Sequence, residues 1–419
     1  MISTVASYWL KIQSGLFPGF AEELGRTTDK HLKLMLVLDV VKVEDHLVVD
    51  PYPMSRGRPK LDATAMARAF VAKSVLNIPT TRALIDRLNA DAVLRRICGF
   101  EQRAHVPCEA SFSNWFARFA NGKFAERVHE ALVREAHKDV PVHNVSRDST
   151  SIEAREKPAS KAAKPKKTPN RRGRPKKDEV RPAPEPSRLE RQLTMSLAEQ
   201  IGDLPTACDF GLEKNAKGIT TGWIGFKLHI DTAEGAVPIT CVLTSASEHD
   251  SAVALPFESM TGSIISSLYT LMDAAYDAAI IREQTEHHGK IAVIDSNPRR
   301  GEKIDFEPPK KLRFRARTEA ERINSHLKDD YGGRYVRARG AVKVMSHLMF
   351  GVLALTAMRL VTLGTYGPGD EIKGTNRLRC AGSVPFEKTT FCEVHKGREV
   401  PRRAHRSGVF RRVRCTSCT

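Results

Sequence analysis

The chain has 419 residues, of which 41% are hydrophobic and 28% are charged, and its formal net charge at pH 7 is +18. This length and composition exclude a chain too small or too polar to form a core, and two or three domains fit within it. The excess of positive charge predicts association with a polyanion, most commonly nucleic acid, although a basic surface without chemistry is the alternative.

Neither a membrane span nor a secretory signal is predicted. The longest apolar run, Leu348 to Met358, is shorter than the roughly 20 residues with which a helix crosses a bilayer. Residues 1–17 lack the basic segment and long apolar stretch of a signal peptide. Eight scattered cysteines fit a reducing cytosol better than a disulfide scaffold. We therefore expect a cytoplasmic protein that does not contact membranes.

Residues 1–140 predict an all-α N-terminal domain. Apolar residues recur at helical spacing from Asp62 to Ile78, where Asp62 is suited to cap the helix, and again in residues 80–100. Residues 111–139 predict two further amphipathic helices. Short helices joined by tight turns, with Arg and Lys on their outer faces, suit a helix-turn-helix-like DNA-binding domain. A plain helical bundle used for dimerisation explains the pattern equally well, so both interpretations stay open.

A basic segment interrupts the chain after a short predicted strand that ends at Asp148. Residues 155–177 hold eleven Lys or Arg, one acid and no apolar side chain larger than alanine. That composition predicts a disordered linker, which we take as residues 155–185. Because residues 155–177 carry +10 of the chain's +18, the rest of the protein is only modestly basic.

Part of this linker, residues 170–177, resembles an AT-hook, in which an Arg-Gly-Arg core lies along an A·T-rich minor groove. The core here is Arg172-Gly173-Arg174, so Arg172 and Arg174 are predicted DNA contacts, and a second core occurs within residues 56–60. A polycationic tether that binds phosphates without reading sequence is the alternative.

The second half of the chain predicts an α/β domain over residues 141–365. Alternating apolar residues in 221–231 and a second run in 237–244 predict a β-hairpin, and Asp250 is suited to cap a helix after it. Strand, helix, strand and helix follow at 266–273, 277–289, 290–295 and within 310–330. With the strand at Asp148, this order predicts an RNase H-like fold, namely a mixed five-stranded sheet with flanking helices.

Three carboxylates fall where such a fold would gather them. Asp148 ends the first predicted strand, Asp273 ends the fourth, and a glutamate lies on the helix after the fifth. Carboxylate oxygens suit hard divalent cations, and two Mg²⁺ ions held about 3.5–4 Å apart serve phosphodiester displacement. Taken singly, Asp148 is also explained as an exposed turn acid, Asp277 as a cap at a helix start and Asp295 as a turn residue.

That last helix offers two glutamates, Glu319 and Glu321. Residues three, four or seven apart share a helix face, whereas residues two apart do not. Arg317, Glu321 and Lys328 fall on one stripe, which places a carboxylate between two cations suited to a phosphate backbone. We therefore predict Glu321 as the metal ligand and Glu319 as a solvated acid at the helix start.

The same residues carry a resemblance to a known family. The pattern Phe314-x2-Arg317-x3-Glu321-x6-Lys328 resembles the Tyr-Arg-Glu-Lys signature of bacterial insertion-sequence DDE transposases, with all three spacings matched. The sequences around Asp148 and Asp273 are similar to that family too, and the resemblance covers roughly residues 40–365. The chain departs from the signature at Phe314, which lacks the tyrosine hydroxyl and any phosphate contact made through it.

The resemblance implies a DNA transposase in which Asp148, Asp273 and Glu321 bind two Mg²⁺ ions, replaceable by Mn²⁺, while Arg317 and Lys328 hold DNA phosphates. It implies nicking at the element's ends and transfer of the freed 3′-hydroxyl into target DNA. The partners would be double-stranded DNA with terminal inverted repeats, target DNA and a second copy of the chain in an active dimer. DNA would hold the protein at the bacterial nucleoid.

Two other functions stay open from the sequence. One is an RNase H-like nuclease or resolvase without strand transfer, and the other is a domesticated, catalytically silent DNA-binding protein. The presence of all three carboxylates and both flanking cations favours an active enzyme.

Residues 366–419 predict a basic C-terminal tail. Two close pairs within it, Cys392-x2-His395 and Cys415-x2-Cys418, have the shape of a structural Zn²⁺ site. The penultimate position of Cys418 and the basic sequence between the pairs favour a disordered tail instead.

Overall fold

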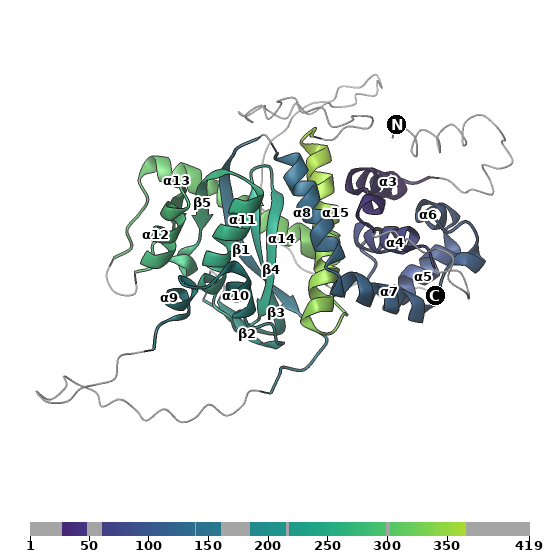
Figure 1. Cartoon of the computed structure of the whole chain (residues 1–419), viewed down its shortest axis with the longest axis horizontal. Coiled ribbons are helices and arrows are strands. Elements are labelled where there is room, and N and C mark those ends of the chain that lie inside the picture. Colours follow the sequence, from purple (N-terminus) through teal and green to yellow (C-terminus); the bar gives the residue numbers. More distant parts are fainter. Residues whose placement is uncertain are drawn as a thin grey trace, which may run out of the picture. The chain divides into compact units, whose positions relative to one another are not determined.

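The computed structural model (Figure 1) describes residues 27–47, 61–138, 140–160, 185–214, 218–298, 302–334 and 336–365, all within one compact unit. The predicted DNA contacts Arg172 and Arg174 lie outside these residues, as do the second Arg-Gly-Arg core and the Cys/His pairs of the tail. The structure therefore does not test the predictions made for these residues.

The first part of the chain is a helical region, as predicted. Its described helices are α3 (Asp29–Val41), α4 (Ala63–Val75), α5 (Thr81–Ala90), α6 (Ala92–Ile97), α7 (Glu109–Asn121) and α8 (Phe124–Ala136). Asp62 caps α4 by accepting a hydrogen bond from the Thr64 backbone at 2.9 Å, and Thr80 caps α5 in the same way. The Asp62 cap is the signal from which the start of α4 was predicted, and Thr80 belongs to the same class of capping residues.

The second part contains a mixed sheet, which confirms the predicted sheet type, but the sheet has six strands among the described residues and the predicted number of five is wrong. Its described strands are β1 (Val142–Glu153), β2 (Asp209–Lys214), β3 (Thr220–Ala233), β4 (Val237–Ser245), β5 (Ser267–Met272) and β6 (Ile291–Ile294). The path β4-β3-β1 is antiparallel, and β1-β5-β6 is parallel. Strand β2 adds an antiparallel partner to the start of β3 and is not predicted by the sequence. Its apolar residues Phe210 and Leu212 are exposed, so they give no core-facing pattern.

Strand β1 is longer than predicted. It continues to Glu153, so the prediction that Asp148 ends this strand is wrong. The extension arises because β3 is itself long, and the two strands stay paired as far as Glu153 and Gly225. On the other side of β1, pairing with β5 stops at Ser146 and Leu271. Asp148 therefore lies within a strand, at the point where one neighbouring strand has just ended.

Helices flank this sheet. They are α9 (Arg188–Gln192), α10 (Leu197–Gly202), α11 (Ala254–Ile264), α12 (Ala279–His287), α13 (Pro308–Phe314), α14 (Thr318–Asp330) and α15 (Ala341–Thr362). The predicted helix in 277–289 is confirmed as α12. The predicted helix within 310–330 is interrupted, because a 3-10 helix, Arg315–Arg317, separates α13 from α14.

Helix α15 joins the helical region to the sheet. It packs against α3, α4, α7, α8 and β4, and α8 and α15 lie side by side in Figure 1. By length and composition α15 could also cross a membrane, but 78% of its most apolar window is buried inside the protein, as in a core helix. One hydrophobic cluster contains side chains of both parts, among them Met66 of α4 and Phe226 of β3. A division near residue 140 thus does not separate two cores.

A buried ion network ties β1 to its surroundings. The side chain of Arg147 is 1% exposed, and its Nε and Nη2 lie 2.8 and 2.9 Å from the carboxylate oxygens of Asp231 on β3. Its Nη2 is also 3.2 Å from Glu258 on α11, whose other oxygen lies 3.0 Å from Lys290 Nζ. Two cations therefore face two carboxylates without solvent, an arrangement whose disruption leaves buried charge uncompensated.

Replacing Arg147 by Met should lower the free energy of unfolding by about 3–5 kcal/mol, because Asp231 and Glu258 lose their main counter-ion. Denaturant unfolding at pH 7 measures this loss. The matched control is Arg82→Met, which breaks an exposed ion pair with Glu109 and should leave stability nearly unchanged. Equal effects of the two substitutions would contradict the structural role assigned to the network.

Candidate active site

Asp148 and Asp273 lie at the same level on neighbouring parallel strands. Ser146 on β1 is the partner of Leu271 on β5, so continuing that register by two residues sets Asp148 beside Asp273, the first residue after β5. Asp273 also accepts a hydrogen bond from the Ala275 backbone at 3.0 Å, which fixes its side chain at the strand end. The two predicted aspartates are therefore brought together by sheet register.

Asp148 receives two hydrogen bonds from the helical segment that faces β1. Arg317 Nη1 donates to its Oδ1 at 3.3 Å, and Asn324 Nδ2 donates to its Oδ2 at 3.0 Å. The Asp148 side chain is only 18% exposed. Burial raises its pKa to about 6; the charge of Arg317 opposes this rise, and that of Asp273 adds to it.

Arg317 joins Asp148 to Glu321. Its Nη2 donates to Glu321 Oε1 at 2.8 Å while its Nη1 contacts Asp148, so one guanidinium bridges two of the three predicted carboxylates. Glu321 is 55% exposed and is free to move more easily than Asp148. The guanidinium also lies 5.9 Å from the Phe314 ring, at the edge of cation–π range. The aromatic face is thus kept where the family signature has tyrosine.

Lys328 is placed further along β1 than the carboxylates. Its Nζ donates to Ser151 Oγ at 3.2 Å, three residues beyond Asp148 on the same strand. Burial lowers the pKa of Lys328. The two predicted phosphate-binding cations, Arg317 and Lys328, therefore contact β1 at two positions three residues apart. Only Arg317 contacts Asp148.

Glu319 points away from these residues. Its Oε2 accepts a hydrogen bond from the Ala236 backbone, at 3.3 Å, in the turn between β3 and β4. It is half-buried, and burial raises its pKa. The prediction of a solvated acid is wrong, since Glu319 anchors the helix start to the hairpin turn.

A fourth carboxylate, Asp250, lies in the same neighbourhood and is missed as a site residue by the sequence analysis. The expected capping role is wrong, because His249 accepts the cap hydrogen bond from the Ser251 backbone. Asp250 instead lies 2.9 Å from Lys227 Nζ, and its charge contributes to the raised pKa of Asp273, whose first cause is burial. The signal in the sequence is an acid shortly after a strand, the rule that finds Asp273.

Two family models match this chain. A transposase domain of the DUF772 type matches residues 24–118, and a transposase DDE domain matches residues 206–357. Together they cover more than half of the chain. The chain belongs to the insertion-sequence DDE transposases. Asp273 and Glu321 of this transposase lie inside the second match, whereas Asp148 lies between the two. No curated protein matches the chain significantly.

DDE transposases depend on divalent metal, generally Mg²⁺, and the donors around Asp148 suit it. Among the residues that the structure describes, no three His, Cys, Asp or Glu side chains are arranged to hold a metal ion. Asp148 and Glu321 do not form such a group because the guanidinium of Arg317 lies between them. Burial without a nearby divalent charge raises the pKa of both Asp148 and Asp273, so a hard cation would relieve both carboxylates.

Asp148→Asn should stabilise the metal-free transposase at pH 7.5 by about 1–3 kcal/mol. The folded pKa of Asp148, about 6, exceeds the unfolded value of 3.8, so the folded state binds more protons between these values. The carboxylate consequently weakens the fold as pH rises from about 4 to about 6, and the gain on substitution should vanish below about pH 4. Denaturant unfolding with a chelator, repeated across this pH range, tests it.

The control for this substitution is Asp250→Asn, for which the opposite sign is expected. Burial alone would raise the pKa of Asp250, but the charges of His229 and Lys227 and hydrogen bonds from Lys227 and Ser149 hold it below its usual value. Its carboxylate therefore stabilises the fold above about pH 4, and its loss should destabilise the protein at pH 7.5. If both substitutions changed the free energy of unfolding in the same direction, the conclusion that the Asp148 carboxylate destabilises the metal-free fold would be contradicted.

Proposed function

We propose that this transposase cuts DNA at the ends of its element and joins the freed 3′-hydroxyl to target DNA. Residues 141–365 would form an RNase H-like catalytic domain, and residues 1–140 a helical region for DNA binding or dimerisation. The order β4-β3-β1-β5-β6, antiparallel and then parallel, supports the RNase H-like assignment.

One observation carries the catalytic proposal. Asp148 and Asp273 share a level on two neighbouring parallel strands, and Arg317 from the facing helical segment contacts both Asp148 and Glu321. One guanidinium thus binds Asp148 and Glu321, and Asp273 lies beside Asp148 at the end of β5. Several carboxylates close to a single monovalent cation are typical of a site that binds a divalent cation.

Asp148, Asp273 and Glu321 would hold two Mg²⁺ ions, which supply activation of a water or hydroxyl nucleophile and stabilisation of the leaving oxygen when bound. Asn324 keeps Asp148 oriented through its amide. Arg317, once it leaves the carboxylates, is placed to donate two parallel hydrogen bonds to a phosphate beside the scissile bond. Lys328 would hold a neighbouring phosphate as a point charge.

Glu321→Gln should reduce metal-dependent nicking of end-bearing DNA about 100-fold or more, because one ligand of the metal pair loses its charge. Binding of the same DNA should persist. Glu319→Gln is the matched control, two residues away on the same helix but bonded to the β3–β4 turn, and it should retain nicking. Loss of nicking with Glu319→Gln alone would overturn the assignment. Separating nicked from joined products decides between a transposase and a simple nuclease.

Arg317→Gln should raise the affinity for Mn²⁺ in the absence of DNA, by roughly threefold to tenfold, since a competing cation is removed from Asp148 and Glu321. Nicking should nevertheless fall, because the phosphate contact is lost. Titration calorimetry with Mn²⁺ and the nicking assay give the two readouts. If metal affinity and nicking fell together, Arg317 would be supporting the carboxylates and not competing for them.

A further inference from the structure

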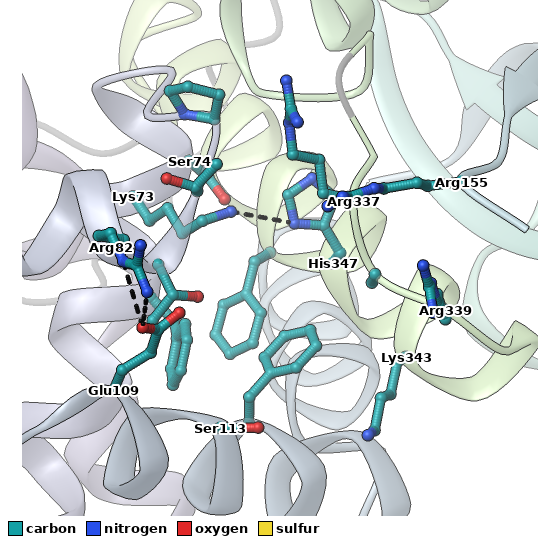
Figure 2. A pocket seen from close by; sticks show the side chains of 17 residues that line it. Lys73, Ser74, Arg82, Glu109, Ser113, Arg155, Arg337, Arg339, Lys343 and His347 are labelled. Atoms are coloured by element: carbon teal, nitrogen blue, oxygen red, sulfur yellow. Dashed lines mark hydrogen bonds and ion pairs between the residues drawn. The ribbon is translucent and has the colours of Figure 1, made fainter.

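A basic cavity of about 540 Å³ lies beyond the far end of β1 (Figure 2). It is bounded by α4, α5 and α7 on one side and by residues 337–350, including the start of α15, on the other. Phe70, Phe116 and Phe350 form apolar wall. Its cations, besides Arg82, are Lys73, Arg155, Arg337, Arg339 and Lys343.

Lys73 is the buried cation of this cavity. Its residue is 8% exposed, and its Nζ lies 3.4 Å from His347 Nδ1. The other nitrogen, His347 Nε2, lies 3.0 Å from the Gly332 carbonyl, to which it can only donate, so Nδ1 is the acceptor and the ring is neutral. Burial lowers the pKa of Lys73 to about 8 and that of His347 to about 3. The ammonium therefore has a hydrogen-bond acceptor but no negative partner among the described residues.

The remaining charges of the cavity do not supply that partner. Arg155, Arg337, Arg339 and Lys343 are exposed and form no ion pair within the described parts of the chain. The acid that lines the cavity, Glu109, is held by Arg82 at 2.9 Å. A buried charge is costly unless it is paired, so an anion that enters the cavity would complete the coordination of Lys73.

We propose that this cavity binds a backbone phosphate of the DNA substrate, remote from the scissile bond; the proposal rests on the proposed function in taking DNA as substrate. The position of the cavity supports DNA over a free anion. Arg317 contacts Asp148 and Lys328 contacts Ser151 within β1, and Arg155, which lines the cavity, follows two residues after the strand ends at Glu153. A strand advances about 3.3 Å per residue, so the end of β1 at Glu153 lies roughly 17 Å from Asp148.

That length corresponds to about five base pairs of duplex, at about 3.4 Å each. The cations Arg317, Lys328 and Arg155 would then follow a single DNA path, with the Lys73 cavity at its end. The phenylalanine wall keeps water from one side of the cavity, which strengthens the attraction between the ammonium and a phosphate.

The first test compares Lys73→Met with Lys30→Met, the same substitution at an exposed lysine of α3 that does not line the cavity. Affinity of the full chain for end-bearing DNA is measured against salt concentration. Loss of one phosphate contact should reduce the slope of log K against log salt by about 1 in Lys73→Met. Lys30→Met should keep the wild-type slope. An unchanged slope in Lys73→Met overturns the proposal.

The second test locates the phosphate. Single phosphates of the DNA are replaced in turn by neutral methylphosphonates, and binding is measured for each duplex. DNA binding by the wild-type protein should be weakened by a replacement about five to seven base pairs from the nick, and Lys73→Met should be insensitive to that replacement. Equal sensitivity of both proteins at every position contradicts a phosphate held by Lys73.

A free anion is distinguished by inorganic phosphate. If phosphate raises the melting temperature of wild type but not of Lys73→Met, while the salt slope on DNA is the same for both, the cavity takes a free anion and the DNA proposal fails. Lys73→Met should fold at least as stably as wild type, because it removes an unpaired buried charge. Should it not fold, the exposed pair Arg337→Gln and Arg339→Gln carries the same slope test.

The test of the cavity can fail or succeed independently of the test of the proposed function. Glu321→Gln, which removes a catalytic carboxylate, should keep the full salt slope. A reduced slope in Lys73→Met together with a wild type that never nicks DNA would support the cavity and reject the transposase chemistry; the reverse pattern would reject only the cavity.

Discussion

The ion network around Arg147 is the constraint on which the site depends. Arg147 and Asp148 are neighbours on β1, and successive strand residues point to opposite faces. By binding Asp231 and Glu258 in the protein interior, Arg147 fixes which face of β1 is turned inward and how β1 is placed against β3 and α11. Asp148 is thereby directed to the other face, toward Arg317 and Asn324. A shift of one residue in β1 would bury Asp148 and expose Arg147.

The site itself is organised by competition between cations. Asp148, Asp273 and Asp250 are carboxylates within electrostatic reach of one another, and without a divalent ion their charges are compensated by Arg317 and Lys227. A guanidinium suits both carboxylate and phosphate through the same paired geometry. In the proposed function, a DNA phosphate would offer Arg317 an alternative partner when Asp148 and Glu321 would be needed as metal ligands. DNA binding and assembly of the metal site would be coupled through this one side chain.

Much of this arrangement follows from local sequence, and the rest depends on tertiary pairing. The caps at Asp62 and Thr80, the hairpin of β3 and β4 and the carboxylate after β5 are local signals, and the structure contains all of them. The extent of β1 is not local, since it is set by the length of β3. The role of Asp250 is equally unpredictable from local sequence, because it depends on an ion pair with Lys227 of β3. Helical spacing relates Arg317 to Glu321 correctly even though the helix is broken between Phe314 and Thr318.

Net charge indicates a polyanionic partner but does not say where it binds. Most of the formal excess of +18 lies in the segment 155–177, and many cations elsewhere are already matched, such as Arg147 and Lys290 in the interior. A cation that has no negatively charged partner among the described residues is a better indicator of a binding surface. Lys73 meets that condition in the interior, where a missing partner is most costly. Because a fold retains such a charge only at a loss in stability, its position beside exposed arginines and at the end of β1 is best explained by an anion that arrives with the substrate.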